Sequence, residues 1–196
     1  MADRPVYGLV LAGGKSRRMG QDKALLDHNG QSQLAYVAGV LDACVERVFV
    51  STRADQAAEE ERAQYEQIVD RYDEIGPVAG ILSALEEKPD VDWLVVACDL
   101  PNISEQTIRY LLEHREGGQA FTAFTSSHDG LPEPLCAIYR AGCENIVHRF
   151  VDEGMNCPRK ILIRSETRLL DQPNPEALNN VNTPDDLRNS VLQANA

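Results

Sequence analysis

The sequence predicts an α/β fold: a Rossmann-like, mostly parallel β-sheet with helices on both faces. Short apolar runs rich in Val, Leu and Ile alternate along the chain with longer segments whose apolar residues recur at helical spacing. The apolar runs are continuous, which is typical of strands that are buried on both faces. A chain of 196 residues suits one domain, so we expect 1–196 to form a single unit.

The first half of the chain holds the clearest elements. Four apolar runs are predicted as strands, at 6–12, 47–51, 68–70 and 92–99. Helices are predicted at 34–45, over the acidic stretch 55–66, and after Gly76-Pro77 and Ser104. A serine cap and a proline in the first turn are common helix starts. Glycine or polar residues follow these strands, at the end where parallel sheets bind their ligands.

The second half of the chain is less regular. A strand is predicted at 133–139, a helix at 141–152 and a short strand at 160–164. A last helix is predicted to begin at Thr183, because threonine can cap a helix and Pro184 suits its first turn.

The composition excludes several classes of protein. The net charge is −12, from 31 acidic and 19 basic residues, and such a chain repels the phosphates of nucleic acids. No apolar stretch approaches the ~20 residues of a membrane span. The N-terminal apolar run is too short for a signal peptide, so we expect a cytoplasmic protein. The five cysteines form no C-x-x-C pair, and the four histidines lack metal-ligand spacing.

A basic segment follows the first predicted strand. Residues 13–23 hold four basic residues and one acid. Gly13 and Gly14, at its start, let the backbone approach a ligand closely and offer N–H groups to phosphate oxygens. Local positive charge in an acidic protein indicates a small, highly charged anion as ligand, with a solvated loop as the alternative. The P-loop pattern is excluded because it requires glycine where Leu9 stands, and the glycine spacing excludes the dinucleotide fingerprint.

The segment Leu11–Lys23, L-A-G-G-K-S-R-R-M-G-Q-D-K, resembles the signature of nucleotidyltransferases of the molybdenum cofactor guanylyltransferase (MobA) type. Later segments agree with this family in order and approximate spacing: Asp70, 76–80, 97–101 and 180–184. The resemblance therefore covers nearly the whole chain. It implies the fold of nucleotide-diphospho-sugar transferases, with a nucleotide-binding half at 1–103 and an acceptor-binding half at 104–196.

The resemblance implies a Mg²⁺-dependent enzyme that transfers GMP from GTP to the terminal phosphate of molybdopterin, with or without molybdenum, and releases pyrophosphate. It implies no nucleic-acid or membrane partner, and transient contacts with other proteins of cofactor assembly. Relatives that transfer CMP usually carry Leu-Ala-Ala-Gly in the loop, so Gly13 favours the guanylyl form. The alternatives are a cytidylyltransferase of the same cofactor, a sugar-phosphate nucleotidyltransferase and a catalytically silent nucleotide-binding module.

The resemblance also implies the residues of the site. The catalytic residues would be Arg18, Lys23 and Asp99. The nucleotide would be bound by the glycine loop and the strand ends, namely Leu11, Ala12, Gly13, Gly14, Lys23, Ser51, Asp70 and Asp99. Ser51 departs from the family, which often has asparagine there. Asp99 and Asn182 would hold Mg²⁺, which commonly takes one or two protein oxygens.

Ordinary structural roles are the alternatives for these residues. Asp99 precedes Leu100-Pro101 and could be a turn residue, and Asn182 could belong to a helix cap. Arg159 and Lys160 form a basic pair in the second half. They could hold the phosphate of molybdopterin or form a solvated surface pair.

Overall fold

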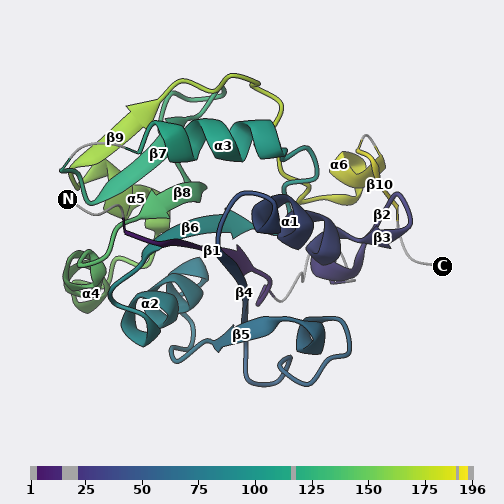
Figure 1. The fold of residues 1–196 in the computed structure, drawn as a ribbon, viewed down its shortest axis with the longest axis horizontal. Helices are drawn as coiled ribbons and strands as arrows, with labels where there is room; N and C mark the ends of the chain where they lie inside the picture. Colours follow the sequence, from purple (N-terminus) through teal and green to yellow (C-terminus); the bar gives the residue numbers. More distant parts are fainter. Residues whose placement is uncertain (1–3, 15–21, 116–117, 189, 194–196) are drawn as a thin grey trace.

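The computed structural model describes residues 4–14, 22–115, 118–188 and 190–193. Its centre is a seven-stranded sheet in the order β5-β4-β1-β6-β8-β7-β9 (Figure 1). In chain order the strands are β1 (Val6–Leu11), β4 (Arg47–Thr52), β5 (Glu66–Val69), β6 (Asp92–Ala97), β7 (Phe121–Thr125), β8 (Pro132–Tyr139) and β9 (Thr167–Leu170). The four strands predicted in the first half correspond to β1, β4, β5 and β6.

Most neighbouring strands of this sheet are parallel. Strands β5, β4, β1 and β6 run in one direction, and β7 is parallel to β9. Strand β8 alone is antiparallel to its neighbours β6 and β7. It is reversed because only residues 126–131 join it to β7, and a parallel pair needs a crossover of about a dozen residues or more. The predicted, mostly parallel sheet is confirmed.

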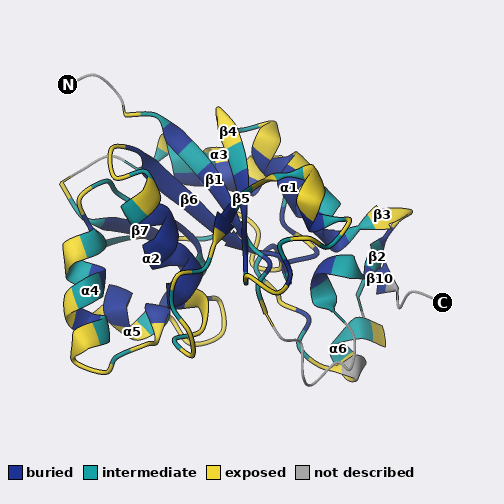
Figure 2. Cartoon of the chain, turned by 90° about the horizontal axis from the view of Figure 1, so that it is seen from below, coloured by how far each residue is buried: buried dark blue, intermediate teal, exposed yellow. Residues whose placement is uncertain are grey.

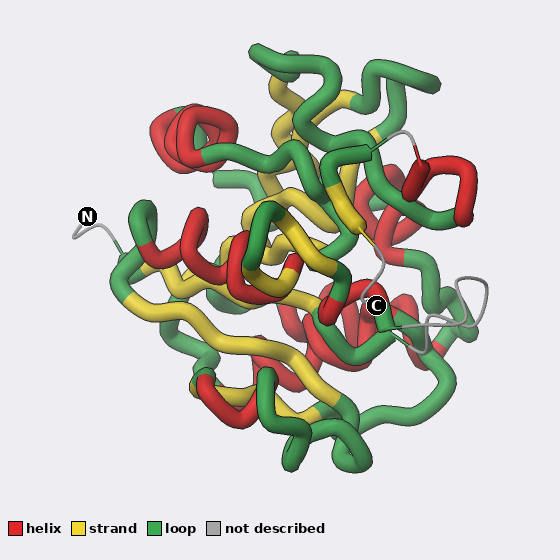
Figure 3. Tube along the Cα trace, turned by 90° about the vertical axis from the view of Figure 1, so that its right-hand side faces the viewer, coloured by secondary structure: helices red, strands yellow, loops and turns green. Residues whose placement is uncertain are grey.

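Helices cover both faces of the sheet, as predicted (Figures 1 and 3). One face carries α1 (Gln33–Asp42) and α3 (Glu105–Glu113), and the other carries α2 (Pro77–Glu87), α4 (Glu144–Asp152) and α5 (Pro158–Ile163). Ser104 caps α3 as predicted, since its hydroxyl accepts from the amide of Thr107. None of the described helices is long and apolar enough to cross a membrane.

Strand β6 shows why the sheet takes two layers of helices. All of its residues are buried. Successive side chains of a strand point to opposite faces. Accordingly, Leu94 and Val96 pack in the core beneath α1 and α3, whereas Trp93 and Val95 pack in the core beneath α2, α4 and α5. A strand that is apolar at both faces is stable only between two layers.

The acidic stretch 55–66 is not the predicted helix. It forms turns and the short 3₁₀ helix η2 (Arg62–Gln64) before β5 begins. The stretch lacks an apolar stripe that would hold a helix against the sheet. The side-chain amide of Gln67 instead donates to the carbonyls of Ala57 and Arg62, which holds the backbone in turns.

The second half differs from the prediction at three places. Residues 160–164 belong mostly to α5 instead of a strand, because Pro158 opens a helix whose Ile161 and Leu162 are both buried. The strands β7 and β9 are not among the predicted elements. The predicted strand 133–139 is β8, and the predicted helix 141–152 is α4, which begins at Glu144.

A second, three-stranded sheet joins the C-terminal segment to the region that follows β1. Its order is β10 (Leu192–Gln193), β2 (Asp27–His28) and β3 (Gln31–Ser32). Beside it lies α6 (Pro184–Arg188), at the same end of the molecule (Figure 2). Leu26, Val181 and Leu192 form the buried cluster of this region. The chain around residue 182 is thereby brought next to Lys23.

Candidate active site

A cleft of about 1240 Å³ opens at the carboxyl ends of the parallel strands. It lies beyond β1, which has β4 on one side and β6 on the other. Parallel sheets bind their ligands at such a point, where the strand order reverses. The cleft is lined by residues from the strand ends, including Leu11, Ala12, Gly13, Gly14, Ser51, Asp70 and Asp99, and by the start of α2. Lys23 also lines it.

Lys23, Asp99 and Asn182 meet at one side of this cleft. The Nζ of Lys23 lies 3.2 Å from Oδ2 of Asp99 and 2.6 Å from Oδ1 of Asn182. The amide of Val181 donates to the carbonyl of Asp99 at 3.1 Å, which holds the neighbouring Asn182 beside the end of β6. The structure thus brings together residues that are 76 and 159 positions apart in the chain.

The oxygens of Asp99 and Asn182 converge on a cation. The ammonium of Lys23 lies between them, where it is partly shielded from water. Carboxylate and amide oxygens are also ligands that Mg²⁺ accepts. The described residues contain no group of three or more His, Cys, Asp or Glu that could hold a metal ion. A divalent cation at this point would therefore complete its shell with water and with oxygens of a substrate.

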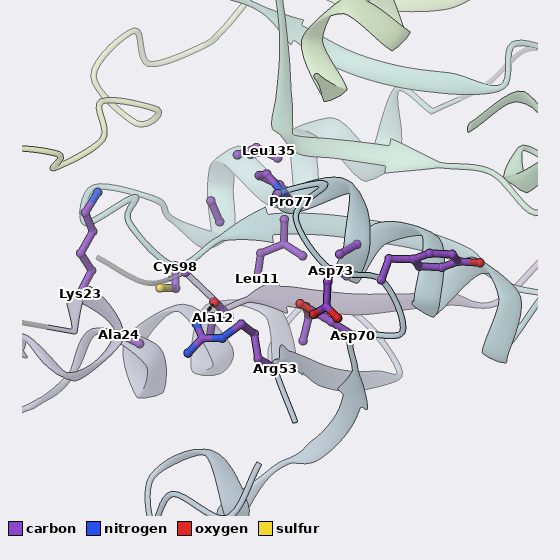
Figure 4. Close-up of a pocket in the computed structure, with 18 of the residues that line it drawn as sticks. Leu11, Ala12, Lys23, Ala24, Arg53, Asp70, Asp73, Pro77, Cys98 and Leu135 are labelled. Atoms are coloured by element: carbon purple, nitrogen blue, oxygen red, sulfur yellow. Dashed lines mark hydrogen bonds between the residues drawn. The ribbon is translucent and has the colours of Figure 1, made fainter. Parts of the chain in front are cut away.

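Ser51 and Asp70 meet at the other side of the cleft. The hydroxyl of Ser51 donates to Oδ1 of Asp70 at 2.7 Å, and the amide of Asp70 donates to the carbonyl of Thr52 at 2.8 Å. Burial raises the pKa of Asp70, while the Ser51 hydrogen bond and the nearby Arg53 guanidinium act in the opposite direction. Figure 4 shows Lys23 and Asp70 on opposite sides of Leu11 and Ala12.

Gly13 lies against the carboxylate of Asp70. A Cβ atom at position 13 would stand 3.1 Å from Oδ2 of Asp70 and 3.5 Å from the backbone nitrogen of Arg53. The guanidinium of Arg53 also donates to the carbonyl of Gly13. The glycine therefore allows the end of β1 to lie close to the ends of β4 and β5.

Helix α2 approaches the sheet through Gly80. A Cβ atom there would lie 2.1 Å from Oγ and 3.0 Å from Cβ of Ser51, so a larger residue would displace one of the two elements. Gly76, at the start of α2, has φ 62° and ψ −142°, a conformation that other residues rarely adopt. The two glycines place α2 against Ser51 and open the cleft at its N-terminus.

Two predicted residues lie apart from this arrangement, and a third, Arg18, lies outside the described residues. Arg159 and Lys160 lie in α5 and do not line the cleft. The Arg159 guanidinium pairs with carboxylates of Asp129 and Glu133, each at 2.9 Å. The assignment of Arg159 and Lys160 to the phosphate of the acceptor stays a prediction.

Sequence reasoning missed several charged residues that line the cleft, among them Arg53 and Asp22. Arg53 pairs with Asp55 and contacts Gly13, and Asp22 caps the short 3₁₀ helix η1 (Lys23–Leu25) through the amide of Ala24. Arg53 lies just beyond the second predicted strand, a position that could have identified it. Asp22 is the single acid of the basic segment, which also distinguishes it in the sequence.

A profile of the family described as the MobA-like NTP transferase domain matches residues 8–169, most of the chain. The chain belongs to this family. The matched range holds every cleft residue predicted from the sequence, and Asn182 follows it.

Curated relatives of this MobA-like chain agree with that result. A molybdenum cofactor biosynthesis bifunctional protein from Synechocystis is 36% identical over 186 residues, which are 95% of this chain and 54% of that protein. The chain thus spans about half the length of this relative. A probable molybdenum cofactor guanylyltransferase from Pelotomaculum thermopropionicum is 35% identical over 198 residues, which cover 95% of this chain and 92% of that protein.

A solved structure shares the fold. The crystal structure of molybdopterin-guanine dinucleotide biosynthesis protein A from Archaeoglobus fulgidus matches with a TM-score of 0.78 and 24% identity. The match covers 93% of this chain and 95% of that chain. The nucleotidyltransferase type of α/β fold that the sequence predicts is confirmed.

Proposed function

We propose that this MobA-like chain transfers GMP from GTP to the terminal phosphate of molybdopterin and releases pyrophosphate. The observation that carries the proposal is the cluster of Lys23, Asp99 and Asn182 at the edge of a cleft that begins with Gly13-Gly14. The names of the curated relatives support the choice of donor and acceptor.

The reaction requires positioning and charge neutralisation more than a protein nucleophile. The phosphate of the acceptor attacks the α-phosphate of GTP, and the bond to pyrophosphate breaks, so the acceptor itself supplies the nucleophile. The backbone N–H groups at Gly13 and Gly14 would donate to phosphate oxygens, and the ammonium of Lys23 would balance the charge of the leaving pyrophosphate. Both groups line the same cleft.

The pair of Asp99 and Asn182 fits a magnesium ion by its chemistry. Both side chains offer an oxygen to one point, as their contacts with the Lys23 ammonium demonstrate. When bound, Mg²⁺ would supply charge neutralisation at the reacting phosphates. Lys23 would then turn from these oxygens toward the triphosphate, because a lysine side chain carries its charge on a flexible stem.

The opposite side of the cleft would hold the nucleoside. Asp70, fixed by Ser51, presents a carboxylate that can accept hydrogen bonds from a ribose or from the N–H groups of guanine. Gly13 lies directly against this carboxylate, so an alanine there would press on Asp70. This contact supports a guanine donor over the cytidylyl alternative, whose loop usually carries alanine at this position.

The test is a direct assay of product. The protein is incubated with Mg²⁺ and molybdopterin and, in parallel, with GTP, CTP or UTP, and the dinucleotide and pyrophosphate are measured by mass spectrometry and a coupled assay. We expect a guanine dinucleotide, with discrimination well above tenfold against CTP, because a wrong base leaves buried polar groups unpaired. Equal use of CTP would favour the cytidylyl alternative. Nucleotide binding without pyrophosphate release would favour a silent module.

A further inference from the structure

Arg62 is a fully buried arginine within the acidic stretch 55–66. Its side chain has an exposed fraction of 0%. Arginine is rarely buried to this extent unless its charge is paired. Here the guanidinium pairs with the carboxylates of Asp22 and Glu59, and it also donates to the carbonyl of Ala12. It does not line the cleft, although Ala12 and Asp22 do.

One nitrogen of Arg62 contacts Ala12, just before the basic segment 13–23, and Asp22, near the end of that segment. Its Nη2 lies 2.7 Å from the carbonyl oxygen of Ala12 and 2.7 Å from Oδ2 of Asp22. Ala12 follows β1 and precedes Gly13-Gly14, whereas Asp22 immediately precedes Lys23. The relative position of the two ends is therefore fixed by a third segment that is 50 and 40 residues away in the chain.

Asp22 connects Arg62 to the turn that contains Lys23. Its Oδ1 accepts from the amide of Ala24 at 3.0 Å and so caps η1, the 3₁₀ helix that Lys23 begins. Its other oxygen is held by Arg62. The carboxylate thus links the buried guanidinium to the turn from which the Lys23 side chain reaches Asp99 and Asn182.

We propose that Arg62 is a positioning residue for the triphosphate site. By holding Ala12 and Asp22 together, it sets the distance between the backbone N–H groups after β1 and the ammonium of Lys23. These two sets of donors must contact different oxygens of one triphosphate. The inference rests on the proposed function, and it assigns to the stretch 55–66 a role in binding GTP.

The test compares Arg62→Gln and Arg62→Lys with Asp22→Asn and with Arg47→Gln. Arg47 is a matched control, because its guanidinium pairs with Glu66 on the exposed surface, away from the cleft. GTP affinity is measured by titration calorimetry, kcat and KM by product formation, and Tm by thermal unfolding. Activity and affinity are measured at a temperature at which every variant is folded.

We expect Arg62→Gln to lower GTP affinity and kcat/KM about tenfold or more, because small misplacements of binding groups have effects of this size. Arg62→Lys should recover part of the loss, and Arg47→Gln should leave both quantities unchanged. The double variant Asp22→Asn/Arg62→Gln should lose no more than the more affected single variant, since the two residues act through one contact.

A lower Tm with unchanged GTP affinity and unchanged kcat/KM would show that Arg62 only stabilises the fold, and would overturn the inference. If Arg62→Gln does not fold, Asp22→Asn removes the same ion pair from its partly exposed partner, and unchanged GTP affinity there overturns the inference equally. If the native protein binds GTP without forming a dinucleotide, the proposed function fails, and the GTP affinities of the variants still decide the role of Arg62. A native protein that does not bind GTP would refute both.

Discussion

Lys23 is held in place at both ends of its side chain. Its backbone begins a 3₁₀ helix that Asp22 caps, and its ammonium contacts Asp99 and Asn182. A lysine normally moves among many conformations, and these contacts keep its ammonium at the edge of the cleft. With Mg²⁺ on Asp99 and Asn182, the ammonium would have only to turn toward the triphosphate.

The variant Lys23→Ala should reduce kcat/KM by about 10²-fold or more, the usual effect of removing one preorganised charge that stabilises a transition state. Lys88→Ala is a suitable control, because the Lys88 ammonium lies over the ring of Phe49 and away from the cleft. Steady-state kinetics with saturating Mg²⁺ measure both. Similar losses in the two variants would mean that the net charge, and not a positioned lysine, is what matters.

The raised pKa of Asp70 predicts that the stability of the protein depends on pH. Its pKa in the folded protein lies above the ordinary value of 3.8, chiefly because of burial. The folded protein thus binds this proton more tightly than the unfolded chain. The resulting stabilisation is complete below pH 3.8 and is lost as the pH rises through the folded-state pKa.

The variant Asp70→Asn should not show this loss, since its side chain does not titrate and its amide oxygen can still accept from Ser51. Urea unfolding of both proteins from pH 3.8 to neutral pH measures the difference. The stability of the wild type should fall relative to the variant as the pH rises. A difference that stays constant over this range would contradict the assignment.

At the scale of the elements, α2 is fitted to β4 by the contact between Gly80 and Ser51. Overfilling such a contact typically costs about 1–3 kcal/mol. We expect Gly80→Ala to destabilise the protein by about this amount and to weaken GTP binding, because Ser51 and its partner Asp70 would shift.

A second helical glycine provides the matched control. Gly39 lies in α1, and apart from its chain neighbours and the backbone of its own helix, no described atom lies within 4 Å of the place that a Cβ would take. Gly39→Ala should therefore stabilise the protein by about 0.5–1 kcal/mol, since alanine is the better helix former. Urea unfolding of the two variants gives both values. A destabilisation of similar size in both would show that the Ser51 contact is not the cause.

The elements that could be predicted from the sequence are those whose pattern is local. Strand β6 is apolar at almost every position, and α3 has a serine cap, so both are evident without knowledge of the fold. The stretch 55–66 depends on the burial of Arg62 against Ala12 and Asp22, a contact that no local pattern encodes. Strand β9 depends on its pairing with β7 in the same way.

The residues of the candidate site also fall into those that a local pattern predicts and those that depend on contacts in the folded chain. Asp70 and Asp99 stand at the ends of predicted strands, and the fold rule for parallel sheets places such residues along the same edge of the sheet. Asn182 is predicted only by the resemblance of its segment to the family, because its position depends on the second sheet and on the hydrogen bond from the Val181 amide to the Asp99 carbonyl. Arg53 and Asp22 act through contacts that are formed only in the folded chain.

At the scale of the whole molecule, the C-terminal segment is held by a small core of its own. Leu192 packs with Leu26 and Val181, next to the residue that reaches Lys23. Removing most of this side chain should allow the segment to open more readily than the main sheet does, since regions with few buried contacts open with low free energy.

We expect Leu192→Ala to lower the opening free energy of this segment by about 2 kcal/mol, the lower end for such truncations. The Val181 amide should then exchange its hydrogen about 30-fold faster, since 1.4 kcal/mol corresponds to a factor of ten. The amide of Val95, in the central strand, should be unaffected. Hydrogen exchange followed by NMR measures both, and an unchanged rate at Val181 would show that Leu192 does not hold this segment.

The common direction of β1, β6 and β7 has a consequence for the distance between two substrates. These strands end at the same rim, and in the sheet order β8 lies between β6 and β7. Neighbouring strands lie about 4.8 Å apart, so three strand spacings separate the ends of β1 and β7 by about 14 Å. Backbone hydrogen bonds fix this spacing. The sheet therefore fixes the distance between a ligand bound beyond β1 and another bound beyond β7, and Asp99 follows β6, one of the two strands between them.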